Sequence, residues 1–240
     1  MRREAIARVI TAYDAPVIRA YSAARFLILR QRFLDEIGQY LPQEGPILDI
    51  GCGFGLFSLY YAQILPGARF RGFDLNARRV EIARAAARRL RLSNVEYAVG
   101  DARDYRAEAE YAAVYMLDIV HHIPSETVEP LLAALYKSLA PGGRLIVKDV
   151  DTQPAYKRWF THTLDRLMSP RGVIHYWPVD ALQALLERVG FRVYRHLMVD
   201  FLPYPHALYV CYREESMPAA RGNRLLVTNG RVAVQQSEKP

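Results

Sequence analysis

The sequence predicts an α/β fold in which a mostly parallel sheet carries helices on both faces. From Pro46 onward, short apolar runs of strand length alternate with longer stretches whose apolar residues recur at helical spacing. The first run, residues 47–50, is rich in β-branched and apolar residues, as expected of a strand buried on both faces of a parallel sheet. Strands that alternate with helices in this way indicate an open α/β sheet.

Length and composition indicate one globular core in a reducing compartment. The chain has 240 residues, and no apolar run approaches the roughly 20 residues of a membrane helix. Charged residues in the first turns argue against a signal peptide, and two cysteines are too few for a disulfide framework, so we expect a cytoplasmic protein. The net charge of +7 favours anionic partners, although the excess is nearly all arginine and is equally consistent with genomic bias.

Residues 1–44 are expected to form a helical cap of two helices ahead of the sheet. An apolar stripe recurs every three or four residues along its second half, at Phe26, Leu29, Phe33, Ile37 and Leu41. Tyr13 and Tyr21 fall in a less regular stretch around Pro16.

The first strand passes directly into a glycine-rich turn and then into a helix over residues 54–65. Gly51, Gly53 and Gly55 would let a ligand lie against bare backbone at a helix N-terminus. The spacing G-x-G-x-G is one residue shorter than the dinucleotide fingerprint. Asp49, two positions before the first glycine, would oppose a diphosphate but attract a cationic ligand.

This motif resembles the first motif of the class I S-adenosylmethionine-dependent methyltransferases, an acidic residue followed by G-x-G-x-G. The stretch 139–145, which contains Pro141-Gly142-Gly143 and would turn a helix back into the fifth strand, is a second match to that family. The resemblance covers about residues 45–213. It implies a seven-stranded Rossmann-like sheet whose last strand is antiparallel, and S-adenosylmethionine as cofactor. The aromatic residues between Pro154 and Pro178 suggest a lid insertion at about 150–178 with an apolar acceptor pocket, or a small satellite core under a long loop.

Acidic residues follow the second and third predicted strands. Asp74 ends the second strand, 19 positions after Gly55, where a carboxylate can accept both ribose hydroxyls. Capping of the next helix is the alternative, for which Asn76 is better placed. After the third strand, expected over residues 95–99, the resemblance implies that Asp101 reaches the adenine amine and that Ala102 offers its N–H to the ring, although Gly-Asp turns are also common without a ligand. By motif position it further implies cofactor contacts from Cys52, Leu75, Leu117 and Asp118.

Two histidines follow the fourth strand, residues 111–117, in the loop that this topology turns toward the methyl group. A histidine four residues after Asp118 recurs in phosphoethanolamine-type methyltransferases, where it works with a tyrosine of the N-terminal cap. By that analogy His122 is the general base or orients the acceptor, with Tyr13 or Tyr21 as its partner, and Asp118 lies at the start of the same loop. The alternatives are a polar turn for the histidines and simple packing for the tyrosines. We expect no metal site, because no second carboxylate stands at ligand spacing.

The remaining chain completes the sheet. A fifth strand is expected over residues 144–149, then the aromatic-rich lid, a helix over 180–189 closed by Gly190, and two antiparallel strands over 191–199 and 206–213. In the segment 214–240, Asn229-Gly230 signals a small hairpin, with a loose tail as the alternative.

The leading functional hypothesis is methyl transfer from S-adenosylmethionine to an N, O or C atom of a small, apolar or lipid-like acceptor. Arginines in the N-terminal helices favour peripheral contact with an anionic membrane. An RNA or other nucleic-acid methyltransferase and a non-catalytic cofactor-binding module are the alternatives. Nucleic-acid enzymes that methylate amino groups usually carry Asn or Asp, two prolines and an aromatic residue at the fourth strand, and this sequence does not. The glycine spacing argues against a nicotinamide dehydrogenase.

Overall fold

One seven-stranded sheet organises the molecule. The computed structural model describes residues 2–29, 31–107, 109–150, 174–198 and 206–213, and the backbone of 225–228 and 231–234. The strands are β1 (Glu44–Ile50), β2 (Gly67–Asp74), β3 (Val95–Val99), β4 (Tyr111–Leu117), β5 (Leu139–Val150), β6 (Phe191–Met198) and β7 (His206–Arg213). Their order is β3-β2-β1-β4-β5-β7-β6, with β7 antiparallel to both of its neighbours. The predicted Rossmann-like sheet with an antiparallel last strand is therefore confirmed.

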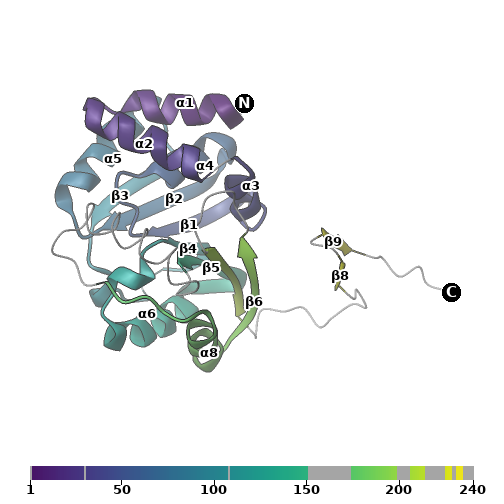
Figure 1. The fold of residues 1–240 in the computed structure, drawn as a ribbon. Coiled ribbons are helices and arrows are strands. Elements are labelled where there is room, and N and C mark those ends of the chain that lie inside the picture. Colours follow the sequence, from purple (N-terminus) through teal and green to yellow (C-terminus); the bar gives the residue numbers. More distant parts are fainter. Residues whose placement is uncertain are drawn as a thin grey trace.

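Helices cover both faces of this sheet (Figure 1). One side carries α1 (Arg2–Ala12), α2 (Pro16–Ile28), α3 (Gln31–Gly38), α4 (Leu56–Ile64) and α5 (Ala77–Leu90); the other carries α6 (Ser125–Ser138) and α8 (Val179–Val189). Two short 3₁₀ helices, η1 (Ala102–Asp104) and η2 (Val120–His122), follow β3 and β4. No described helix combines the length and the apolar character needed to cross a bilayer.

The central strands feed two hydrophobic cores, one on each face. In β4, Tyr115 and Leu117 pack with the N-terminal helices, whereas Val114 and Met116 pack with α6 and α8. Successive side chains of a strand point to opposite faces, so a strand covered on both sides must be apolar at nearly every position. This explains the continuous apolar runs in the sequence.

The N-terminal segment holds three helices where two were predicted. Leu29 leaves the helical region at φ −90° and ψ 60°, so the expected second helix divides into α2 and α3. The predicted stripe is nevertheless buried, from Phe26 at 5% exposed to Leu41 at 4%. The periodicity therefore identified the buried face correctly but not the continuity of the helix.

The predicted Pro-Gly-Gly turn lies within β5, which begins at Leu139 rather than at residue 144. Tyr111 pairs with Leu139 and Ala113 with Arg144, so the residues between them form a bulge. Gly142 has φ +77°, and a Cβ on Gly143 would lie 2.8 Å from the Ala140 carbonyl oxygen. The glycines are thus required by the bulge.

Part of the predicted lid and tail lies outside the described residues. Of the expected lid at 150–178, residues 151–173 are not described. In the C-terminal segment, β8 (Leu225–Thr228) and β9 (Arg231–Val234) pair antiparallel.

Candidate active site

The glycine-rich turn after β1 is fastened to the end of β2. The amides of Gly51 and Cys52 donate to the Phe73 carbonyl at 2.9 and 3.0 Å, and the Gly53 amide donates to Asp74 Oδ2 at 3.0 Å. All three glycines of the motif have positive φ, between 54° and 77°. The motif therefore specifies one backbone path, which runs across the carboxyl ends of both strands.

The three glycines meet different surroundings. A Cβ on Gly51 would lie 2.7 Å from the Ile119 side chain, and one on Gly55 would lie 2.5 Å from the Tyr97 hydroxyl. A Cβ on Gly53 would meet nothing within 4 Å. The outer glycines are required by packing, whereas Gly53 faces the open side of the turn, where a ligand can lie against the backbone.

Asp49 is a buried carboxylate beneath this turn. It is 3% exposed, and its Oδ2 has no hydrogen-bond partner among the described residues. Burial raises the pKa of Asp49 to about 7; the Ser58 and Tyr115 hydroxyls oppose that shift and the Asp74 carboxylate adds to it. A buried carboxylate with one unpaired oxygen suits a cationic ligand, so Asp49 and the open side of Gly53 fit the expected S-adenosylmethionine.

Asp74 links the turn to the start of the next helix. Its Oδ2 accepts from the Gly53 amide, and its Oδ1 accepts from the Asn76 amide at 2.8 Å. Asn76, not Asp74, caps α5, because its side chain accepts from the Arg79 amide at 3.1 Å. The capping alternative for Asp74 is thereby removed, and its ribose contact stays a prediction. The adjacent Leu75 is 65% exposed.

Asp101 caps the short helix η1. Its carboxylate accepts from the amide of Arg103 at 2.9 Å and from the Arg103 guanidinium Nε at 2.8 Å. Hydrogen bonding to Arg103 lowers the pKa of Asp101. The structure thus shows a locally satisfied turn. The contacts of Asp101 and Ala102 with adenine stay a prediction.

Asp118, the acidic residue at the start of this loop, is bound by two cations from distant parts of the chain. Its carboxylate accepts from Arg25 on α2 and from Lys148 on β5. Neither cation was anticipated, because they stand 93 and 30 positions away in the sequence. One signal was available: Lys148 directly follows the apolar run of residues 145–147 in the predicted fifth strand.

Of the two histidines in the loop after β4, His121 is the one that binds the Asp149 carboxylate. Its ring Nδ1 bonds Asp149 Oδ1, and its amide donates to Asp149 Oδ2 at 3.0 Å. His121 is 1% exposed, whereas His122 is partly exposed. The two rings lie 4.2 Å apart, and Tyr176 stacks on His121 at 5.4 Å. His121 is therefore firmly held, and His122 beside it is the more accessible of the two.

Both candidate tyrosines lie against the glycine turn. The hydroxyl of Tyr13 donates to the Phe54 carbonyl at 2.9 Å, and burial raises its pKa. The ring of Tyr21 meets the Phe54 ring edge-on at 5.7 Å and is partly exposed. These contacts favour a packing role for Tyr13 and leave Tyr21 as the better candidate for the acceptor pocket.

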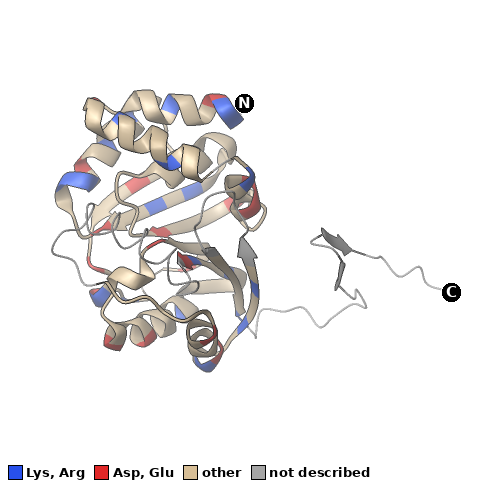
Figure 2. Cartoon of the chain, in the orientation of Figure 1, with Lys and Arg blue, Asp and Glu red and all other residues tan. Residues whose placement is uncertain are grey.

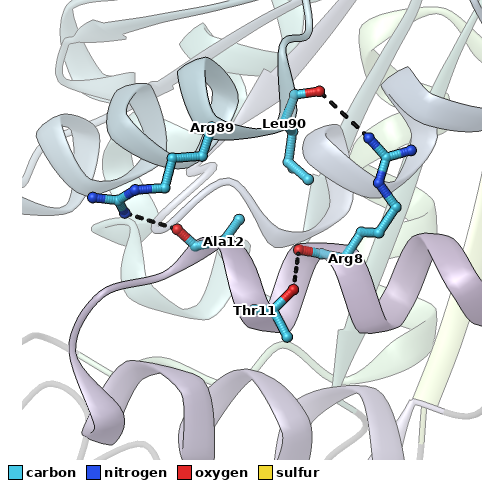
Figure 3. A pocket seen from close by; sticks show the side chains of 5 residues that line it. All are labelled: Arg8, Thr11, Ala12, Arg89 and Leu90. Carbon is cyan, nitrogen blue, oxygen red and sulfur yellow. Dashed lines mark hydrogen bonds between the residues drawn. The ribbon is translucent and has the colours of Figure 1, made fainter.

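A surface pocket of about 260 Å³ between α1 and α5 has a structural explanation (Figure 3). Arg89 donates to the Ala12 carbonyl at 2.8 Å, and Arg8 donates to the Leu90 carbonyl at 3.5 Å. Each arginine thus serves a carbonyl at the C-terminal end of the other helix, where carbonyls lack partners within their own helix. The pocket residues are Arg8, Thr11, Ala12, Arg89 and Leu90, and none belongs to the glycine turn.

Comparison with known proteins gives consistent matches. A family described as a methyltransferase domain matches residues 20–196. The ubiquinone biosynthesis O-methyltransferase of Xanthomonas oryzae is 31% identical over 149 residues, which cover 60% of this chain and 60% of that protein. The fatty-acid O-methyltransferase of Mycolicibacterium smegmatis is 26% identical over 168 residues, covering 65% of this chain and 59% of that protein.

Two further matches widen the range of chemistry and extend the fold. Phosphoethanolamine N-methyltransferase 2 of Caenorhabditis elegans is 30% identical over 117 residues, which are 48% of this chain and 26% of that protein. The chain thus spans about 60% of the length of the first relatives and less of this one. A solved SAM-dependent methyltransferase from Methanosarcina mazei matches with a TM-score of 0.59 and 20% identity, over 73% of this chain and 95% of that one, which shows the shared fold.

Proposed function

The chain belongs to the class I S-adenosylmethionine-dependent methyltransferase family, and on that premise we propose that it methylates an oxygen atom of a small, largely apolar acceptor. The observation that carries the proposal is the glycine turn with its open side at Gly53, above the buried carboxylate of Asp49. This arrangement offers bare backbone and negative charge to one ligand.

The chain's own residues would hold S-adenosylmethionine along three strand ends. Asp49 lies below the turn for the cationic part of the ligand, Asp74 would accept the ribose hydroxyls, and Asp101 with Ala102 would meet the adenine. Cys52, Leu75, Leu117 and Asp118 flank these positions in the motif. Bound there, S-adenosylmethionine would supply a methyl group activated by a positively charged sulfur. The protein's part is then to orient the acceptor and exclude water.

An oxygen acceptor is favoured over an ammonium by the ion pairs at the ends of β4 and β5. The carboxylate of Asp118 already serves Arg25 and Lys148, and that of Asp149 serves His121. A site built for an ammonium would be expected to offer it a carboxylate. Two of the relatives above are named as O-methyltransferases, of ubiquinone biosynthesis and of fatty acids, and this supports an oxygen atom on an apolar body.

His122 is the proposed general base. It is partly exposed, so an acceptor hydroxyl can reach it, and a neutral imidazole can take a proton near neutral pH. His121 lies against it and is anchored by Asp149. Tyr21, on the cap side of the turn, is the proposed contributor to the acceptor pocket.

Methyl-labelled S-adenosylmethionine and a small panel of acceptors test this proposal. The panel contains simple phenols, long-chain fatty acids and phosphoethanolamine. We expect the label on the phenols or on the fatty acids. Label on the amine alone would contradict oxygen transfer. Asp74→Ala serves as the binding control and should abolish cofactor binding in calorimetry. The proposed function would be contradicted altogether if folded wild-type protein bound neither S-adenosylmethionine nor S-adenosylhomocysteine at millimolar concentration.

A further inference from the structure

Lys148 is a fully buried cation that the proposed chemistry does not use. Lysine is almost never fully buried unless it is paired, because its ammonium group loses its hydration. Lys148 is 0% exposed; its Nζ lies 5.5 Å from the centre of the Phe33 ring and forms an ion pair with Asp118. Burial lowers the pKa of Lys148, while Asp118 favours its charged form. Burying this ammonium group costs hydration free energy, which indicates that Lys148 has a specific role at this position.

The partner of Lys148 has an unusual backbone conformation. Asp118 has φ +57°, in the left-handed region that is unfavourable for a residue with a Cβ. The Asp118 amide donates to the Lys148 carbonyl at 2.9 Å, while the Asp118 carboxylate accepts from the Lys148 ammonium. Lys148 thus holds Asp118 through both main chain and side chain. Arg25 adds a donor from α2.

The next residue of β5 holds the other end of the same loop. Asp149 accepts from the His121 amide at 3.0 Å and bonds its ring. Consecutive residues of a strand point to opposite faces of the sheet. Lys148 and Asp149 therefore bind the loop after β4 from opposite faces of the sheet. Lys148 binds it at Asp118, and Asp149 binds it at His121.

We propose that Lys148 is a positioning residue, which keeps Asp118 in its left-handed conformation and thereby fixes the loop that carries His121 and His122. The conformational role stands independently of the reaction. Its consequence for catalysis rests on the proposed function.

Hydrogen exchange of Lys148→Met tests the conformational role without any acceptor. The amides of His121, His122 and Ile123 are bonded to Asp149 Oδ2, Ile119 O and Val120 O at 2.9 to 3.0 Å. We expect these three amides to exchange at least tenfold faster in the variant. In the same variant, the amides of Gly51 and Cys52, which are bonded to the Phe73 carbonyl, should keep their wild-type exchange rates. The matched control is Lys137→Met, the same change at an exposed position, in which all five amides should exchange as in wild type.

Two double variants separate the effect of the backbone conformation at residue 118 from the effect of losing the ion pair. They remain informative if Lys148→Met alone does not fold. Lys148→Met with Asp118→Gly and Lys148→Met with Asp118→Ala both remove the ion pair, but only glycine accepts a positive φ freely. We expect slow exchange at residues 121–123 in the glycine double variant and fast exchange in the alanine one. Equal rates in the two, unchanged rates in Lys148→Met, or a rise that includes Gly51 and Cys52 would each overturn the proposal.

Turnover then tests the consequence for catalysis. With the acceptor that takes label most strongly from the panel of phenols, fatty acids and phosphoethanolamine, kcat should fall at least tenfold in Lys148→Met, by a larger factor than the KM for S-adenosylmethionine rises, and should be unchanged in Lys137→Met. An unchanged kcat in a variant with a loosened loop would overturn the catalytic part alone, and leave the assignment of the reaction intact.

Discussion

Asp49 and Asp74 are both buried beside the glycine turn, but their carboxylates are satisfied differently. Asp74 accepts two backbone amides, whereas Asp49 Oδ2 has no partner among the residues that the structure describes. Burial disfavours the charged form of Asp49 more than the Ser58 and Tyr115 hydroxyls favour it, and this is why the pKa of Asp49 rises to about 7. Near neutral pH, Asp49 is therefore poised between its two charge states, and a cationic ligand would select the ionised one.

The stability of the ligand-free protein should depend on pH through Asp49. The folded form keeps this proton up to a pH of about 7, while an unfolded aspartate loses it near 4. The contribution is therefore fully present below pH 4 and is lost as the pH rises to 7, by roughly 1 kcal/mol per pH unit. Urea unfolding of wild type and Asp49→Asn from pH 5 to pH 8 measures it, since asparagine does not titrate. A constant difference between the two proteins would contradict the raised pKa.

The two histidines should respond differently to substitution. We expect His122→Ala to bind S-adenosylmethionine normally and to lower kcat by roughly 10² to 10⁴, because a general base supplies an effect of that size. His121→Ala should lower stability, because it leaves the 4% exposed Asp149 without its ring partner. Calorimetry, steady-state rates and urea unfolding separate the effects. If His121→Ala lost turnover while His122→Ala kept it, the base would be His121, oriented by Asp149.

At the level of elements, the sequence predicted the strands well because their signals are local. Residues 95–99 and 111–117 were predicted with the bounds that β3 and β4 have, since glycine or an acidic residue closes each apolar run. The break at Leu29 was missed, because the apolar stripe continues through it without a proline or glycine. The contacts of Arg25 and Lys148 with Asp118 were missed for a different reason: the three residues are distant in the sequence, and only the folded chain brings α2 and β5 to Asp118.

Within the glycine turn, two alanine substitutions should have opposite dominant effects. Gly53→Ala introduces a side chain into open space at φ +54°, so we expect a loss of roughly 1 kcal/mol in stability and at least tenfold weaker cofactor binding. Gly55→Ala places a Cβ 2.5 Å from the Tyr97 hydroxyl and should cost roughly 2 to 5 kcal/mol. Urea unfolding and calorimetry with S-adenosylhomocysteine measure both. Normal binding by Gly53→Ala would place the ligand elsewhere.

On the scale of the whole molecule, α2 presents apolar residues outward as well as inward. Its inner side packs Phe26 into the core and brings Arg25 to Asp118, while Val17 and Leu27 on its outer side are each 75% exposed. The helix contains arginines and no acidic residue (Figure 2). Residues 2–28 hold five arginines against two acidic residues, a net charge of +3. Arg2 and Arg25 are paired with Asp35 and Asp118, but the exposed apolar side chains and the remaining arginines predict contact with an anionic bilayer.

We therefore expect the protein to bind vesicles that contain an anionic phospholipid, more weakly at high salt, and to bind poorly to neutral ones. Burial of Val17 or Leu27 in the interface would contribute roughly 1.5 to 3 kcal/mol each, so Leu27→Glu should weaken binding at least tenfold. Tyr194→Glu, at a 40% exposed position on β6, is the matched control and should bind as wild type does. Vesicle flotation measures this binding. If flotation failed, and sedimentation showed a dimer that Leu27→Glu dissociates, the partner of α2 would be a second copy of the chain.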